Sequence, residues 1–126
     1  MAQHNDLGKY GEKLAFDFLK RKGYQIIATN WKLGKYEIDI IAQTRREIVF
    51  VEVKTRSTDY FGDPSDAVDT RRQRRMTNAA NAYIRYTRCD LEPRFDIISI
   101  IADMQSQTPA QITHIEDAFM PTPDYY

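Results

Sequence analysis

The sequence has few of the residues that build covalent or metal crosslinks. It contains a single cysteine, Cys89, and two histidines in 126 residues. One cysteine excludes an intramolecular disulfide, and two isolated histidines do not make a zinc site. It also lacks a CxxC pair and a glycine-rich loop that could cradle phosphates. An ordinary hydrophobic core must therefore hold the fold, and a chain of this length can build one in a single domain.

Long apolar runs are also missing. The longest stretches, such as IISIIA at residues 97–102, fall far short of the ~20 residues that a membrane-spanning helix needs. The polar opening MAQHNDLGKYGEK lacks the apolar segment of a secretory signal. Together with the lone thiol, these features predict a cytoplasmic protein that does not enter the membrane.

The sequence carries no net charge, since 18 Lys and Arg residues balance 18 Asp and Glu residues. This balance hides a basic segment at residues 69–88, where six arginines accompany one acidic residue. The arginines are Arg71, Arg72, Arg74, Arg75, Arg85 and Arg88. Such a cluster can bind the phosphates of a nucleic acid. It can equally be a solvated helix face or a surface that meets an acidic protein partner.

Hydrophobic periodicity predicts an α/β fold with the element order αβββαβ. Helical spacing runs from Asp6 to Lys22, and β-forming residues then mark strands at 24–31, 36–42 and 47–54. The first two strands form a hairpin, and the third is expected to pair antiparallel with the second.

The second half of the chain completes this pattern. A second helix is expected to begin at Pro64 and to run to Thr87. Strands are predicted at 94–101 and, as a last edge strand, at 112–119. We expect a mixed central sheet flanked by helices in one domain over residues 1–120, followed by an irregular tail at 121–126.

Charged residues interrupt the third strand, because VFVEVKTR at 49–56 carries Glu52 and Lys54 among its valines. Residues two apart on a strand share a face, so these two side chains lie together. The neighbouring strand carries Asp39. If the two faces coincide, Asp39 joins Glu52 and Lys54, and Glu12 at the border of the first helix's packed side can reach the same point.

Carboxylates beside one ammonium group suit a hard divalent cation. Mg²⁺ is usually held by one or two carboxylates together with a substrate phosphate. The ion polarises a phosphoryl oxygen and produces a hydroxide nucleophile, while a lysine orients the water or neutralises charge. This combination suits phosphodiester hydrolysis. The alternative is structural: Glu52 and Lys54 pair with each other or with arginines, and Asp39 caps a strand.

The same residues resemble those of known nucleases. The order of Glu12, YEIDII with Asp39, and VEVK with Glu52 and Lys54 is similar to the D...ExK signature of the restriction-endonuclease-like superfamily. The match to the YraN-like family of bacterial proteins is closer and covers about residues 8–101. Its segments are GKYGEKLAFDFLKRKGY, NWKLGKYEIDIIA, VFVEVKTR, FGDPSDAV and RFDIISI. That family is similar to archaeal Holliday-junction resolvases, which use a helix glutamate as well as strand carboxylates and a lysine.

The resemblance implies a restriction-endonuclease-like fold and a metal-dependent endonuclease acting on DNA, with branched or damaged duplexes as substrates. It implies that Asp39 and Glu52 bind Mg²⁺ or Mn²⁺ and that Glu12 completes the ion site. It further implies that Lys54 assists the attacking water. Junction cleavage would favour a symmetric homodimer. The alternatives are a non-catalytic nucleic-acid-binding module of the same fold and an adaptor that uses its basic helix.

The family pattern also includes positions whose roles it leaves open. Glu37 matches one of its acidic residues, and Tyr36 stands where family members commonly have glycine, so the backbone here approaches a ligand less closely. Asp96, beside Arg94, is either a salt-bridged structural residue or a support for the site. Arg56 is a phosphate candidate, because a guanidinium can bind two phosphate oxygens at once. The other predicted nucleic-acid contacts are Arg71, Arg72, Arg74 and Arg75.

Overall fold

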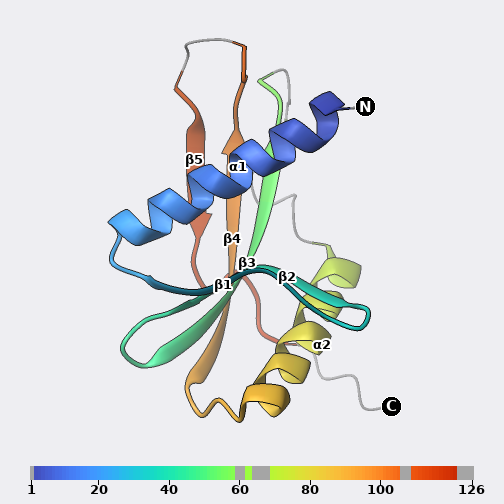
Figure 1. The fold of residues 1–126 in the computed structure, drawn as a ribbon, viewed down its shortest axis with the longest axis vertical. Helices are drawn as coiled ribbons and strands as arrows, with labels where there is room; N and C mark the ends of the chain where they lie inside the picture. The colour runs from blue at the N-terminus through green and yellow to red at the C-terminus, as the bar shows by residue number, and fades with distance from the viewer. Residues whose placement is uncertain (1, 59–61, 64–68, 106–108, 122–126) are drawn as a thin grey trace.

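The computed structural model describes residues 2–58, 62–63, 69–105 and 109–121, with side chains described from Asp6 onward. The elements follow in the order α1 (Ala2–Arg21), β1 (Gln25–Leu33), β2 (Tyr36–Gln43), β3 (Glu47–Arg56), α2 (Thr70–Thr87), β4 (Glu92–Ile101) and β5 (Gln111–Ile115). Five strands form one sheet in the order β1-β2-β3-β4-β5 (Figure 1). The predicted αβββαβ order and the last edge strand are therefore confirmed.

The sheet is mixed, as predicted. β1, β2 and β3 form an antiparallel meander, β4 lies parallel to β3, and β5 returns antiparallel to β4. A parallel neighbour needs a long crossover, and the segment that contains α2 supplies it. Among the described helices, none is long and apolar enough to cross a bilayer.

Each face of the sheet packs against one helix. Ala15 and Leu19 of α1 lie in a buried cluster with Val49 and Val51, whereas Phe50 belongs to a second cluster, with residues of α2. This alternation along β3 is the period-two pattern of a strand that is buried on both faces. Figure 1 shows α1 crossing one face while α2 lies on the other. The two helices can therefore meet a common site only where the sheet is interrupted.

α2 begins later than the sequence suggested. Asp69 has an extended backbone (φ −100°, ψ 172°), and its carboxylate accepts the amide N–H of Arg72 at 2.8 Å. This is an N-cap, so the helix starts at Thr70. The prediction of one unbroken helix from Pro64 onward is wrong, because the extended backbone of Asp69 interrupts it. Residues 64–68 lie outside the described part of the chain.

β5 is also shorter than predicted and ends at Ile115. Asp117 adopts φ 52°, outside the extended region, and its amide N–H turns back to donate to Asp96 at 3.0 Å. The tail predicted at 121–126 falls outside the described residues from 122 onward.

A buried ionic network ties the strands together on the α1 face. Asp96 is fully buried, and Arg94 donates to both of its carboxylate oxygens, at 2.9 and 2.7 Å. Arg94 also donates to Glu47 on β3 at 2.8 Å and to the hydroxyl of Tyr24 at 2.5 Å. The structure thus shows Asp96 in the salt-bridged role, with no contact to Asp39 or Glu52.

A histidine on β5 completes this network. A ring nitrogen of His114, Nε2, lies 2.7 Å from Asp96, and the other, Nδ1, lies 2.8 Å from the ammonium of Lys22. Because an ammonium can only donate, Nδ1 accepts and Nε2–H donates to Asp96. Burial alone would raise the pKa of Asp96, but hydrogen bonds from His114, Arg94 and the Asp117 amide outweigh it and hold that pKa below its ordinary value.

The substitution Asp96→Asn should lower the free energy of unfolding by about 3–5 kcal/mol, because it removes the buried negative charge that accepts hydrogen bonds from Arg94 and His114. Since the folded pKa lies below the unfolded one, the contribution of Asp96 is present above the unfolded value and is lost as the pH falls through the folded value. Urea unfolding at neutral pH measures the loss. Asp17→Asn is the control: it breaks a solvent-exposed ion pair with Lys13 outside this network and should cost less than about 1 kcal/mol. Equal losses would contradict the assignment.

Candidate active site

Asp39 lies where β2 and β3 separate. The last pair of the β2–β3 ladder is Ile40 with Val51, and beyond it Oδ2 of Asp39 accepts the amide N–H of Val53 at 2.8 Å. The side chain therefore replaces a main-chain partner that β3 has lost. In this respect the structural alternative, a strand-capping role, is correct. The contact also fixes the carboxylate at the opening between the strands.

Other carboxylates surround Asp39. Burial, together with the negative charges of Glu52, Glu12 and Glu37, raises the pKa of Asp39 to about 7, against the lowering effect of the hydrogen bond from Val53. Glu52, Glu12 and Glu37 are therefore near enough for their charges to act on Asp39, and the ion site predicted for Glu12, Asp39 and Glu52 stays a prediction. A group of this kind favours a proton or a cation.

Glu12 reaches this region because α1 packs very closely on the end of β3. A Cβ at Gly11 would lie 1.8 Å from Oγ1 of Thr55, so only glycine permits this approach. Glu12 and Asp39 together line a pocket of about 370 Å³ between α1 and the β1–β2 hairpin, which we call the α1 pocket. Sequence reasoning missed Gly11, although a glycine inside a helical pattern is a recognised sign of close packing.

Glu52 is bound to an arginine. It forms an ion pair with Arg72 of α2, and the two side chains are only 18% and 28% exposed. The alternative predicted for Glu52, pairing with an arginine, is thus what the structure shows. The same contact turns Arg72, a predicted nucleic-acid contact, toward the carboxylates. Asp69 helps to hold Arg72 there, since its side chain caps the Arg72 amide.

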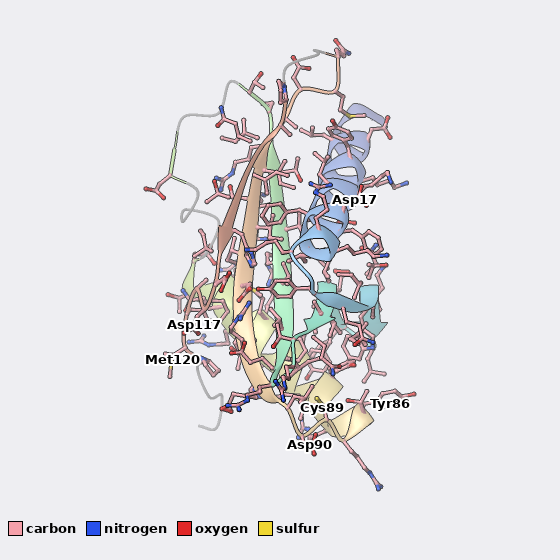
Figure 2. All side chains as sticks on the ribbon, turned by 90° about the vertical axis from the view of Figure 1, so that its left-hand side faces the viewer. Asp17, Tyr86, Cys89, Asp90, Asp117 and Met120 are labelled. Carbon is pink, nitrogen blue, oxygen red and sulfur yellow. The ribbon has the colours of Figure 1, made fainter. Side chains whose placement is uncertain are left out.

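A second pocket, of about 430 Å³, opens on the α2 side of Asp39, and we call it the α2 pocket. Its lining combines carboxylates with cations: Lys35, Tyr36, Glu37, Asp39, Glu52, Arg72, Arg75, Met76 and Asn78. The first turns of α2 are nearest to it, while Tyr86 and Cys89 mark the far end of that helix (Figure 2). Asp39 lies between the two pockets, because it lines both.

The remaining predicted residues are more scattered. Lys54 is half-buried and lines neither pocket, and no described acidic group lies within ion-pair distance of it. Arg56 is half-buried at the end of β3, where its carbonyl accepts the amide N–H of Ala102. Arg71, Arg74 and Arg75 are exposed on α2.

The carboxylates match a divalent metal ion in donor type and in charge. In the described part of the chain, however, no three acidic, histidine or cysteine side chains are already placed to hold an ion. The reason is visible at Glu52, whose carboxylate is turned to Arg72. Asp39, Glu52 and Glu12 could hold an ion after Glu52 leaves this arginine.

Comparison with known proteins places the chain among close relatives. The profile of "Uncharacterised protein family UPF0102" matches residues 11–100. A UPF0102 protein of Parabacteroides distasonis is 49% identical over 119 residues, covering 94% of this chain and 96% of the relative. One from Flavobacterium psychrophilum is also 49% identical over 119 residues, covering 94% and 98%. One from Phocaeicola vulgatus is 46% identical over 121 residues, covering 96% and 98%.

The raised pKa of Asp39 makes stability depend on pH. Its folded pKa of about 7 exceeds the ordinary 3.8, so the folded state holds the proton more tightly and loses stability as the pH rises between these values. The loss should be up to about 4 kcal/mol. In Asp39→Asn this decline should flatten, because the amide oxygen still accepts from Val53 but carries no charge.

Urea unfolding at pH 5 and pH 8 compares the two proteins. Asp17→Asn is the matched control, since Asp17 is an exposed carboxylate on α1 whose only described ion pair joins it to Lys13. It should leave the difference between the two pH values unchanged. A wild-type decline retained in full by Asp39→Asn would show that Asp39 does not cause it.

Proposed function

The chain belongs to the UPF0102 family, the YraN-like group that its motifs predicted, and we propose that it binds DNA and hydrolyses phosphodiester bonds with a divalent metal ion. One observation carries the proposal: Asp39 and Glu52 line the same pocket as Arg72 and Arg75. Carboxylates bind the ion, and arginines bind the phosphate that the ion must meet. Cytoplasmic location and a symmetric homodimer stay predictions.

The acidic residues supply the ion site in this proposal. Asp39 is held in place by Val53, and Glu52 and Glu12 approach from β3 and α1. When bound, the ion would polarise a phosphoryl oxygen and lower the pKa of a coordinated water. Lys54, two residues from Glu52 on the same strand face, supplies a positive charge for the developing phosphorane or for the water.

In this proposal Arg72 can pair with either of two anions. It now neutralises Glu52, and a DNA phosphate offers it a second anionic partner of suitable geometry. When Arg72 turns to a phosphate, Glu52 becomes free as a ligand. The exposed arginines of α2, Arg71, Arg74 and Arg75, add contacts to the backbone that do not depend on sequence.

A second candidate is a non-catalytic DNA-binding module of the same fold. The Arg72–Glu52 ion pair favours it, because a carboxylate that is permanently neutralised does not bind metal. The position of Lys54 outside both pockets favours it as well. The adaptor alternative needs only the exposed arginines of α2 and makes no use of the carboxylates.

A DNA cleavage assay distinguishes the nuclease from the non-catalytic module and the adaptor. Supercoiled plasmid and four-way-junction DNA are incubated with the protein in Mg²⁺ or Mn²⁺, beside Asp39→Asn and Glu52→Gln. Both variants should cut at least ~100-fold more slowly, since a lost metal ligand removes several kcal/mol of transition-state stabilisation. Equal cutting by all three proteins would reveal a contaminant. DNA binding without cutting would favour the non-catalytic module, and no binding at all would favour the adaptor.

The Arg72–Glu52 contact predicts a measurable competition with metal. Arg72→Gln should raise the affinity for Mn²⁺ roughly tenfold, because a hydrogen bond between charged groups is worth on the order of 1.5 kcal/mol. Titration followed by the electron paramagnetic resonance of free Mn²⁺ gives the affinity. Arg75→Gln is the matched control, since Arg75 lines the same pocket and has no ion pair with a described residue. If both variants bind Mn²⁺ like the wild type, Arg72 does not hold Glu52 away from the ion.

A further inference from the structure

Two pockets with different cationic rims meet at Asp39. The α2 pocket has Arg72 and Arg75, and the α1 pocket has Lys9 and Lys13. The phosphate contacts predicted from the sequence are Arg56 and the arginines of α2, so the lysines of α1 have no assigned role. Lys9 and Lys13 lie in the pocket on the other side of Asp39 from these arginines.

Lys9 and Lys13 are placed to bind an anion. They are four residues apart on α1, so they project from the same side of the helix one turn from each other, with Glu12 beside them. Both side chains are exposed. Lys9 has no ion pair among the described residues, and Lys13 has only a surface pair with Asp17 at 3.7 Å, in which the two side chains are 76% and 41% exposed. Water screens such a pair, so both ammonium groups remain available.

The rest of the α1 pocket suits a nucleotide strand. Thr29 and Asn30 are exposed on β1 and offer neutral hydrogen-bonding groups, and Phe16 adds an aromatic ring to the wall. Backbone phosphates, sugars and bases are recognised by cations, neutral donors and rings respectively. The pocket thus has all three kinds of group on the side of Asp39 that is remote from α2.

Cations on the α1 side of Asp39 reduce the repulsion between the carboxylates and a bound phosphate. A phosphate that approaches Asp39 also approaches Glu12 and Glu37, and it is repelled by each. In the α2 pocket Arg72 is bound to Glu52, which leaves Arg75 and Lys35 as its cations without an ion pair among the described residues. Two lysines beside Glu12 reduce the repulsion where the strand leaves the site.

We propose that Lys9 and Lys13 form a second phosphate-binding rim, so that a DNA strand runs from the α2 arginines across Asp39 into the α1 pocket. This inference rests on the proposed DNA-binding function and extends it by giving the path of the strand. The partner is the phosphate backbone of DNA, so the rim contributes to affinity and register, and not to sequence preference.

The test uses charge reversal at pairs of exposed cations. Lys9→Glu with Lys13→Glu is compared with Arg45→Glu with Arg46→Glu, two exposed residues between β2 and β3 that line neither pocket. Both double variants change the net charge equally, so a nonspecific charge effect appears in both. Fluorescence anisotropy gives the affinity for duplex and four-way-junction DNA in EDTA, where no metal-dependent cutting occurs, over a range of salt. Circular dichroism checks the fold of each protein.

The Lys9 and Lys13 variant should bind at least tenfold more weakly, and the slope of log affinity against log salt should shrink by roughly two contacts. The control pair should change affinity less than threefold. Arg71→Glu with Arg75→Glu tests the proposed function itself and should also weaken binding. If this α2 variant binds weakly while the Lys9 and Lys13 variant matches the control pair, the second rim is refuted and the DNA-binding function stands. If wild type binds no DNA, both fail together.

Discussion

The candidate site depends on one hydrogen bond, from the amide N–H of Val53 to Oδ2 of Asp39. It forms where the β2–β3 ladder ends, so it satisfies a main-chain donor that has no strand partner. It also holds a carboxylate at a place where burial and neighbouring charges disfavour its ionised form. A hydrogen bond to the ionised form offsets part of that cost. The separation of the strands, the position of Asp39 and its electrostatic strain are therefore parts of one arrangement.

Two aspartates, Asp96 on β4 and Asp39 on β2, show the contrast between a structural carboxylate and one at the candidate site. Asp96 pairs in register with Val51 and points to the α1 face, where Arg94, His114 and a backbone amide satisfy it. Asp39 is near acidic neighbours and has one described hydrogen bond. The pKa of the first is lowered and that of the second is raised. A pKa perturbed by burial and by unrelieved like charge in a pocket is typical of functional residues, whereas a fully paired buried carboxylate contributes to stability.

The parts of the fold that could be predicted are those fixed by local pattern. Apolar periodicity predicted the order of helices and strands along the chain, and the two-residue spacing in VEVK placed Glu52 and Lys54 correctly on one strand. The motif order also identified the family. The helix start failed because Asp69, a good N-cap, competes with Pro64, a good first-turn residue, and spacing does not decide between them.

The local sequence pattern could not predict contacts between segments that are far apart in the chain. The Arg72–Glu52 pair joins a helix to a strand across 20 positions, and the His114–Asp96 contact follows from the register of β4 with β5. No sequence signal fixes either. The closeness of Gly11 to Thr55 was detectable only as an unexplained glycine in a helix. Sequence therefore identified which residues carry charge at the site, and the structure identified which of them already have partners.

The location of the site follows from the layering of the fold. α1 and α2 cover opposite faces of a sheet whose middle strands are buried on both sides, so their charged residues cannot meet through it. There is an opening where β2 leaves β3, and Asp39 lies in it, with one pocket on each side. Repulsion among the carboxylates makes this opening a poor place for bare charge and a good place for a cation. Arg72 supplies such a positive charge from within the chain through its ion pair with Glu52.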